Sequence, residues 1–254
     1  MRWIFLGCVL LSPALAVAEP ELAADAGTAT ASPLAGLDEL WARRDAADAP
    51  AKMEAALSAA LRAAPNDYAI LWRAARWKWW VADGASGELK KQLGKEGWNL
   101  GERAVAANPN GVEGQHFLAV GIGAYSQAVG IFKALTEGLE GKFNEHLDLA
   151  VKLDPKFFNC GPLIAKGRYF YELPWPKRDL GKSVEMLNKA IASCPASIRA
   201  YVYLAETQLK EGDAKKAKET LGRISGDVAY DPPEGRRTLG MAKIAQGAVD
   251  AELK

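Results

Sequence analysis

The chain has 254 residues, of which 49% are hydrophobic and 25% are charged, and its formal net charge is +1. A charge this close to zero provides no basic surface of the kind that binds nucleic acid or an anionic membrane, so nucleic acid is not an expected partner. The length is sufficient for one large domain or for an extended array of repeats.

Residues 1–18 have the features of an export signal. Arg2 forms a positive n-region, residues 3–15 are mostly apolar, and residues 16–18 read Ala-Val-Ala, an A-x-A cleavage site. The apolar run is too short to span a bilayer as a mature helix. Lipoprotein processing at Cys8 is an alternative, but few apolar residues precede it. We therefore expect a cleaved signal peptide and a periplasmic protein.

Residues 19–34 are rich in Ala, Thr, Ser and Pro and predict a flexible linker. One domain is expected to occupy residues 35–254. From Leu37 onward the sequence shows helical periodicity and almost no strand pattern, which predicts an all-α fold.

Four prolines mark a recurring helix end, and each follows an alanine by five residues: Pro65, Pro109, Pro155 and Pro195. Proline cannot continue a helix and restricts the residue before it, so a helix stops at each of these points. The prolines are 44, 46 and 40 residues apart, and internal periods of this size are typical of stacked helical hairpins.

The predicted helices lie between these ends. In chain order they span residues 67–82, 89–107, 114–124, a helix ending at 153 after a long insertion at 126–143, then 162–172, 180–193, 198–210, 214–223 and 234 to about 252. The last helix is expected to cap the stack, with five charged side chains on its exposed side: Arg236, Arg237, Lys243, Asp250 and Glu252.

The pair at residues 198–223 has the clearest repeat pattern. Its small and large side chains follow tetratricopeptide spacing at Tyr201, Leu204, Ala205, Gly212, Ala217 and Leu221. We therefore predict stacked antiparallel helical hairpins in a divergent tetratricopeptide-like array with a C-terminal capping helix. An irregular helical bundle is the alternative.

Enzyme motifs are missing from the sequence. His116 and His146 belong to no metal-binding spacing, and the Gly-Ile-Gly of residues 121–123 lies inside a helical pattern, where no dinucleotide loop is expected. No G-x-S-x-G motif or P-loop occurs. We expect a protein that is not an enzyme, with no catalytic residues, metal or cofactor.

Cys160 and Cys194 survive signal cleavage, in a compartment where disulfides persist. Cys160 precedes the first helix of its hairpin and Cys194 ends the second, so the two lie at neighbouring ends of antiparallel helices. A structural disulfide is predicted, and two reduced buried thiols are the alternative.

The first helices of stacked hairpins line the concave surface of such an array. Aligning them on their small residues predicts an inner face that is mostly apolar and aromatic, formed by Trp72, Arg76, Trp79, Leu118, Ile122, Tyr125, Ile164, Arg168 and Tyr171. Such a face suits a groove for an apolar ligand, with arginine to hold a carboxylate. The alternative is that these side chains form core, as we expect for Trp77 and Trp80.

Residues 121–221 carry a family resemblance in three segments. These are residues 133–162, residues 167–183 with an aromatic run before Leu-Pro-Trp, and residues 200–213. The segment resembles the TatT component of tripartite ATP-independent periplasmic (TRAP) transporters. A weaker resemblance, to eukaryotic regulators of microtubule dynamics, rests on the shared repeat and would not suit an exported protein.

The TatT resemblance implies a tetratricopeptide-like protein, often lipid-anchored, that associates with a solute-binding protein receiving small, often hydrophobic organic acids. This chain departs from that family in lacking a convincing lipobox at Cys8. The expected partners are a periplasmic solute-binding protein and a small hydrophobic acid, while a homo-oligomer is left open. A general periplasmic scaffold for protein–protein interaction is the alternative function.

Overall fold

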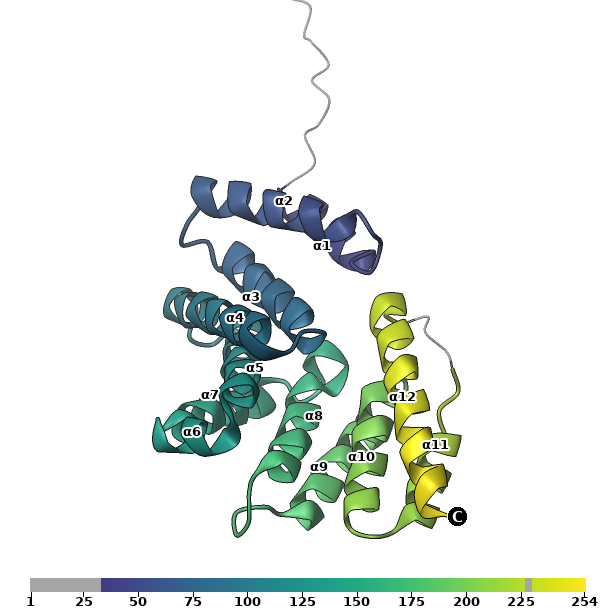
Figure 1. Cartoon of the computed structure of the whole chain (residues 1–254). Helices are drawn as coiled ribbons and strands as arrows, with labels where there is room; N and C mark the ends of the chain where they lie inside the picture. The colour runs from purple at the N-terminus through teal and green to yellow at the C-terminus, as the bar shows by residue number, and fades with distance from the viewer. Residues whose placement is uncertain (1–32, 227–229) are drawn as a thin grey trace, which may run out of the picture. The chain divides into compact units, whose positions relative to one another are not determined.

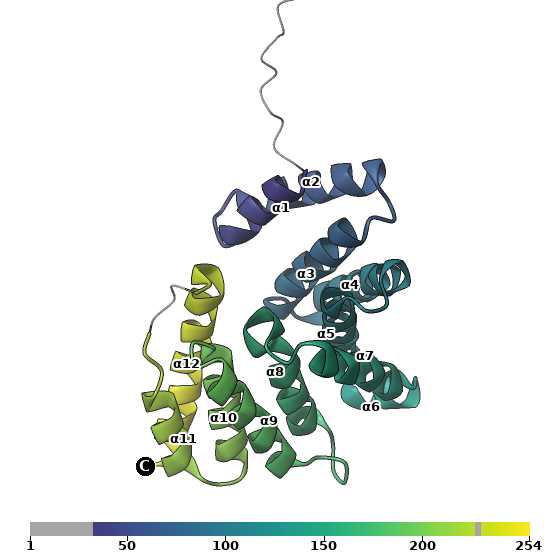
Figure 2. The same ribbon diagram turned by 180° about the vertical axis from the view of Figure 1, so that it is seen from behind.

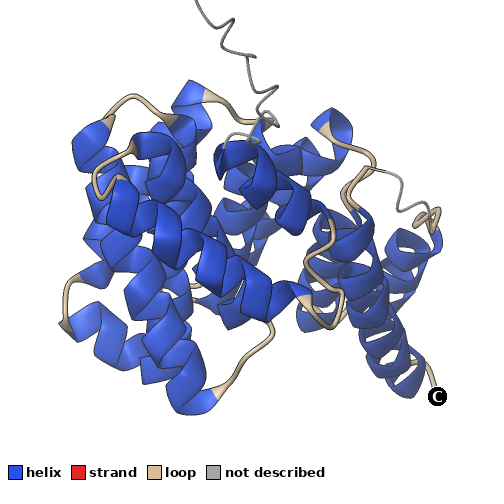
Figure 3. Cartoon of the chain, turned by 90° about the horizontal axis from the view of Figure 1, so that it is seen from above, coloured by secondary structure: helices blue, strands red, loops and turns tan. Residues whose placement is uncertain are grey.

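The computed structural model describes residues 33–226 and 230–254. The predicted signal peptide and most of the predicted linker lie outside these residues. Within them the chain consists of helices joined by short loops, with no strand (Figure 3). None of these described helices is long and apolar enough to cross a membrane.

Twelve helices follow one another in the described residues. They are α1 (Pro33–Ala42), α2 (Ala49–Ala63), α3 (Tyr68–Asp83), α4 (Gly87–Ala107), α5 (Val112–Val129), α6 (Ile131–Thr136), α7 (Leu139–Leu153), α8 (Phe157–Glu172), α9 (Leu180–Ser193), α10 (Ile198–Lys210), α11 (Ala214–Gly222) and α12 (Pro232–Glu252).

These helices form successive antiparallel pairs (Figure 1). The pairs are α1 with α2, α3 with α4, α5 with α7, α8 with α9, and α10 with α11, and α12 packs on α10 and α11 as the predicted cap. The predicted fold class is confirmed. Helix α6 lies in the predicted insertion, and seen from behind it lies beside α5 and α7 (Figure 2).

Helix ends follow the local chemistry expected from the sequence. Helices α2, α4, α7 and α9 each end at a C-cap residue directly before a proline, and the backbone N–H of that residue donates to the carbonyl of an alanine four residues earlier. At the other end, Asp67, Asp179 and Asp213 each accept a hydrogen bond from a backbone N–H in the first turn of the following helix. Such caps satisfy donors that a helix start leaves unpaired.

The closest helix packing in the array is between α4 and α5. A Cβ atom on Gly94 would lie 2.5 Å from the backbone N of Tyr125, and one on Gly101 would lie 2.6 Å from Cα of Leu118. From the other side, a Cβ on Gly121 would lie 2.7 Å from the backbone N of Trp98. Glycine on both helices therefore sets how α5 is rotated against α4.

Candidate functional site

A cavity of about 470 Å³ lies among α1, α3, α5, α6, α7, α8, α10 and the start of α12. Its wall combines aromatic and aliphatic side chains with several arginines and their carboxylate partners. The volume is within the range of pockets that hold small organic ligands.

Helix α3 divides its side chains between this cavity and the core. Arg76, Trp79 and Asp83 recur at i, i+3 and i+7, which places them on the one face that lines the cavity. Trp77 and Trp80 lie on other faces and are 1% and 4% exposed, packed with α1 and α2. The prediction that these two tryptophans form core is confirmed.

Helix α8 contributes Ile164 and Arg168 to the cavity wall, one turn apart. Four of the nine predicted inner residues therefore line the cavity, namely Arg76, Trp79, Ile164 and Arg168. The other five do not.

The predictions for Leu118, Ile122 and Tyr125 are wrong. Leu118 and Ile122 are 1% and 0% exposed and belong to a core cluster with Trp98, against which Tyr125 packs with ring centroids 5.7 Å apart. The close approach of α4 and α5 turns this face of α5 toward α4. The residues that α5 presents to the cavity are instead His116, Val120, Gly123, Ala124, Ser126 and Gln127.

Trp72 and Tyr171 are also placed away from the cavity. Trp72 stacks on Phe117, with centroids 6.3 Å apart and planes 7° from parallel. Tyr171 lies between two cations, with Arg168 4.4 Å and Lys210 3.8 Å from its ring centroid. Trp72 also contacts Arg76 of the cavity wall, whose guanidinium carbon lies 4.8 Å from its ring centroid, so Trp72 and Tyr171 each pack against a wall arginine without forming the wall.

Phe158 is a wall residue that the sequence did not indicate. Helix α8 is kinked at its start, where Phe158, Asn159 and Cys160 have φ values of 50°, 53° and 64°. This left-handed conformation costs roughly 1–2 kcal/mol per residue for residues other than glycine. It places Phe158 and Asn159 on the cavity wall, where Phe158 lies 5.5 Å from Trp79 and 6.1 Å from Trp41 between ring centroids.

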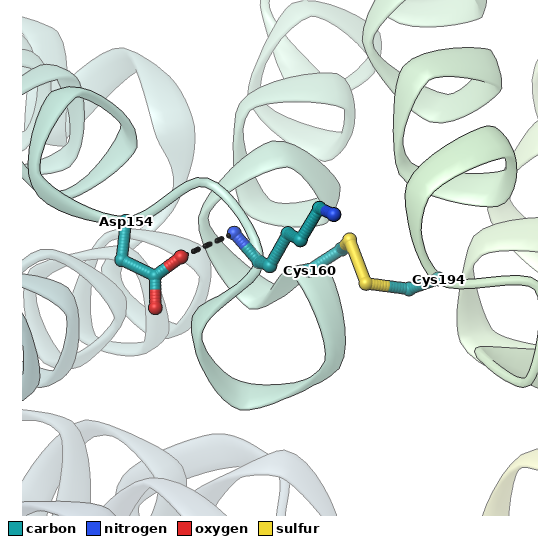
Figure 4. Close-up of a disulfide and its surroundings, with 4 residues drawn as sticks. Asp154, Cys160 and Cys194 are labelled. Atoms are coloured by element: carbon teal, nitrogen blue, oxygen red, sulfur yellow. Dashed lines mark hydrogen bonds between the residues drawn. A yellow bond between two sulfur atoms is a disulfide. The ribbon is translucent and has the colours of Figure 1, made fainter.

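The kink is held on its other side by the predicted disulfide. Cys160 and Cys194 are joined, with their Cα atoms 6.0 Å apart (Figure 4). The same turn is secured by Asp154, whose carboxylate accepts a hydrogen bond from the backbone N–H of Lys156 at 2.8 Å. Regular helix follows from Pro162, where the sequence predicted the helix to begin.

His116 is a fully buried wall residue surrounded by aromatic rings. It is 2% exposed, and its ring centroid lies 5.0 Å from Phe117 and 5.5 Å from Phe157. Its Nδ1 atom has no hydrogen-bond partner among the described residues. Burial lowers the pKa of His116 to about 3, so the ring is neutral at physiological pH.

The arginines of the wall are paired with carboxylates of the same chain. Arg168 forms ion pairs with Glu172 at 2.7 Å and with Glu206. Although burial works to lower the pKa of Arg168, Tyr203, Glu172 and Glu206 raise it above its ordinary value. Arg168 is therefore not free to hold a ligand carboxylate, contrary to the expectation from sequence.

A second group of ion pairs joins distant helices beside the cavity. Arg44 donates to Asp231 at 2.8 Å, and Arg237 approaches Asp83 at 3.3 Å. Arg237 also lies over the Trp80 ring, with its guanidinium carbon 3.2 Å from the centroid. The prediction that Arg237 is on the exposed side of the last helix is wrong, since it is held between α12 and α3.

Metal chemistry has no support in the geometry of this site. Among residues 33–226 and 230–254, no group of three or more His, Cys, Asp or Glu side chains is arranged to hold a metal ion. The wall described above can enclose an apolar molecule and present cations to it.

Comparisons with known proteins give a family and a fold. Among solved structures, the chain is similar to TTC0263, a thermophilic tetratricopeptide protein of Thermus thermophilus. The two are 21% identical with a TM-score of 0.60, over 82% of this chain and 96% of that one. The match to yeast Tom70 is 17% identical with a TM-score of 0.39, over 85% of this chain and 46% of Tom70. No curated protein matches the chain.

The similarity to TTC0263 supports the tetratricopeptide-like fold alone. Residues 34–226 match the family model described as RMD1-3, Regulator of microtubule dynamics protein 1-3. Of the two resemblances seen in the sequence, the weaker one is thus the one that a family model supports. Because that match spans most of the chain, the protein belongs to the RMD1-3 family.

Proposed function

We propose that the protein is a non-enzymatic periplasmic binding protein that holds a hydrophobic organic acid in the cavity. The observation that carries this proposal is the cavity of about 470 Å³, whose wall includes Trp41, Trp79 and Phe158. Pockets of this size, mostly apolar with a few placed polar groups, are the usual sites of small ligands.

The finer part of the proposal is association with the solute-binding protein of a TRAP-type transporter. It rests on the resemblance of residues 121–221 to the TatT component and on the predicted export signal at residues 1–18. The RMD1-3 family name refers to microtubule dynamics. We do not extend that role to this chain, because the predicted export would separate it from microtubules.

Ligand binding can be tested with octanoate and the purified full-length protein. Because Trp41 and Trp79 line the cavity, occupancy should change intrinsic tryptophan fluorescence, with saturation at micromolar to millimolar octanoate. Replacing Ala165 of the cavity wall with phenylalanine should narrow the cavity and weaken octanoate binding. The matched control is Ala55→Phe, since Ala55 is exposed on α2. Equal octanoate binding by both variants would contradict the proposed site.

A scaffold for protein–protein interaction is the second candidate function, and one surface feature favours it. Trp175, in the Pro-Trp-Pro turn between α8 and α9, is 86% exposed. Tryptophan is enriched at the energetic hot spots of protein–protein interfaces. Trp175→Ala should then abolish capture of a protein partner without changing octanoate binding. A partner retained by Trp175→Ala would remove the support for this candidate.

A further inference from the structure

Among the arginines that line the cavity, Arg76 and Arg168 lie on different helices and differ in how far their charge is compensated. Arg168 on α8 has two carboxylate partners, Glu172 and Glu206. Arg76 on α3 has one, an oxygen of Asp38 at 3.2 Å. That carboxylate is shared, because Asp38 also accepts hydrogen bonds from Arg73 at 2.9 and 2.7 Å.

The surroundings of Arg76 do not supply the missing acceptor. Its guanidinium carbon lies 4.0 Å from the Trp41 ring centroid and 4.8 Å from that of Trp72. Arg76 is 9% exposed, and its Nε atom has no hydrogen-bond partner among the described residues. A buried donor without an acceptor is unfavourable, and aromatic faces compensate a cation only in part.

Arg44 adds to the positive charge at this end of the cavity. Arg44 lines the cavity and is 2% exposed, with its guanidinium carbon 3.9 Å from the Trp41 ring centroid. Its Nε atom, like that of Arg76, has no hydrogen-bond partner in the described part of the chain. Three guanidinium groups here, those of Arg44, Arg73 and Arg76, contact two carboxylates, Asp38 and Asp231. This cluster is left with one positive charge in excess.

The charge of Arg168, in contrast, is fully compensated. It contacts two carboxylates, Glu172 and Glu206, and these carboxylates also interact with Lys210. The cation without full compensation therefore lies beside α1 and α3.

We propose that Arg76, with Arg44 beside it, binds the carboxylate of an elongated apolar acid whose chain extends past Trp79 and Phe158. This assignment specifies how the ligand of the function proposed above is held, and it rests on that proposed function. A carboxylate at this point would complete the compensation of the excess charge and accept from the unpaired guanidinium donors. Arg168, already paired with Glu172 and Glu206, does not compete for this carboxylate.

The titration behaviour of Arg76 agrees with this assignment. Burial lowers the pKa of Arg76 to about 10, although the nearby Asp38 acts to raise it, and Arg73 and Arg44 lower it further. Arg168, by contrast, has a raised pKa. The pKa of Arg76 is thus lowered, as expected for an incompletely compensated cation, whereas that of Arg168 is raised, as expected for a fully compensated one.

The test compares octanoate, octan-1-ol and octylammonium at pH 7.5, with intrinsic tryptophan fluorescence and calorimetry on the full-length protein. Wild type should bind octanoate at least tenfold more tightly than the alcohol and bind octylammonium most weakly, since a hydrogen bond to a charged group is worth about ten- to a hundredfold. Arg76→Gln should remove the preference for the acid and leave alcohol binding within about twofold. Arg76→Lys, which keeps the charge, should retain part of the preference.

The control variant is Arg62→Gln, which removes an arginine that is exposed on α2 and should leave all three affinities unchanged. Equal affinity of wild type for acid and alcohol would overturn the assignment to Arg76 while the proposed cavity function stands. An unchanged acid preference in Arg76→Gln would do the same. Binding of none of the three probes would overturn both proposals. If Arg76→Gln does not fold, the relative affinities of wild type for the three probes still show whether the site prefers an anion or a cation.

Discussion

Arg199 on α10 donates two hydrogen bonds to Asp83 at the end of α3, at 2.8 and 3.1 Å, across 116 residues of sequence. Both residues line the cavity. Burial acts to raise the pKa of Asp83, but Arg199 and Arg237 more than offset it and the pKa is lowered. Asp83 thereby joins α3 to α10 and α12 in its ionised form.

Replacement of Asp83 by asparagine should destabilise the protein strongly. Arg199 would keep Glu234 as a partner, but Arg237 would lose its carboxylate, and removing one member of a buried pair costs about 3–5 kcal/mol. We expect a loss of about 2–4 kcal/mol because Asp83 is partly exposed and one partner remains. Urea unfolding measures it. The matched control is Asp48→Asn, whose exposed carboxylate pairs with Arg43 and Lys52, and it should change the stability far less.

Removal of the Cys160–Cys194 disulfide should lower stability by about 3–4 kcal/mol in the chain-entropy model, given the 34-residue separation. Thermal unfolding of wild type should then shift downward on reduction, and the double variant Cys160→Ser with Cys194→Ser should not respond to reductant. Because the bridge holds the kink that places Phe158 on the cavity wall, octanoate binding should also weaken. A mass unchanged by reduction, without the gain of two daltons, would show that the bridge is absent.

The buried His116 should make stability depend on pH in acid. Its pKa is lowered by burial to about 3, whereas the unfolded chain has the ordinary value near 6.5. Between these values the unfolded state binds the additional proton, so stability is lost as pH falls from about 6.5 toward 3, by up to about 1.4 kcal/mol per pH unit. The free energy of unfolding of His116→Gln should lack this part of the pH dependence. An identical pH profile for wild type and variant would contradict the assignment.

Two glycine-to-alanine substitutions should act in opposite directions. Gly101→Ala would place a Cβ atom 2.6 Å from Cα of Leu118, so α4 and α5 would have to separate, at a cost of about 1–3 kcal/mol. Gly240 on α12 has open space around its would-be Cβ atom, and alanine there should stabilise the helix by about 0.5–1 kcal/mol. Chemical denaturation of the two variants would show the difference in sign. Destabilisation of similar size in both would contradict the packing of α4 on α5.

Much of the fold was predictable because its signals are local. Helices α9 and α10 begin and end at the residues expected from the sequence, Leu180–Ser193 and Ile198–Lys210. The disulfide was predictable for the same reason, since its cysteines lie at neighbouring ends of one hairpin. The first hairpin was less clear: α1 begins at Pro33, two residues before the expected domain start.

The cavity was only partly predictable because its wall depends on how each helix is rotated. For α3 the alignment on small residues placed Arg76 and Trp79 correctly. For α5 the same alignment failed at Leu118 and Ile122, since glycines of α4 more than ten residues away select the face that becomes core. The wall position of Phe158 follows from three consecutive left-handed residues, for which the sequence offers no glycine signal.

The amino-acid sequence by itself determined the all-α class, the ends of the helices that stop before a proline, and the pairing of Cys160 with Cys194, because caps, prolines and periodicity act over a few residues. Only the tertiary structure decided which arginine of the cavity remains incompletely compensated. Arg76 has its partner Asp38, and Arg168 one of its two partners, Glu206, 38 residues away in the sequence. Arg44 and Arg199 each contact a carboxylate more than 100 residues away, Asp231 and Asp83 respectively. Which charges compensate one another depends on the distances between side chains in the folded protein, and the spacing of residues along the chain does not give those distances.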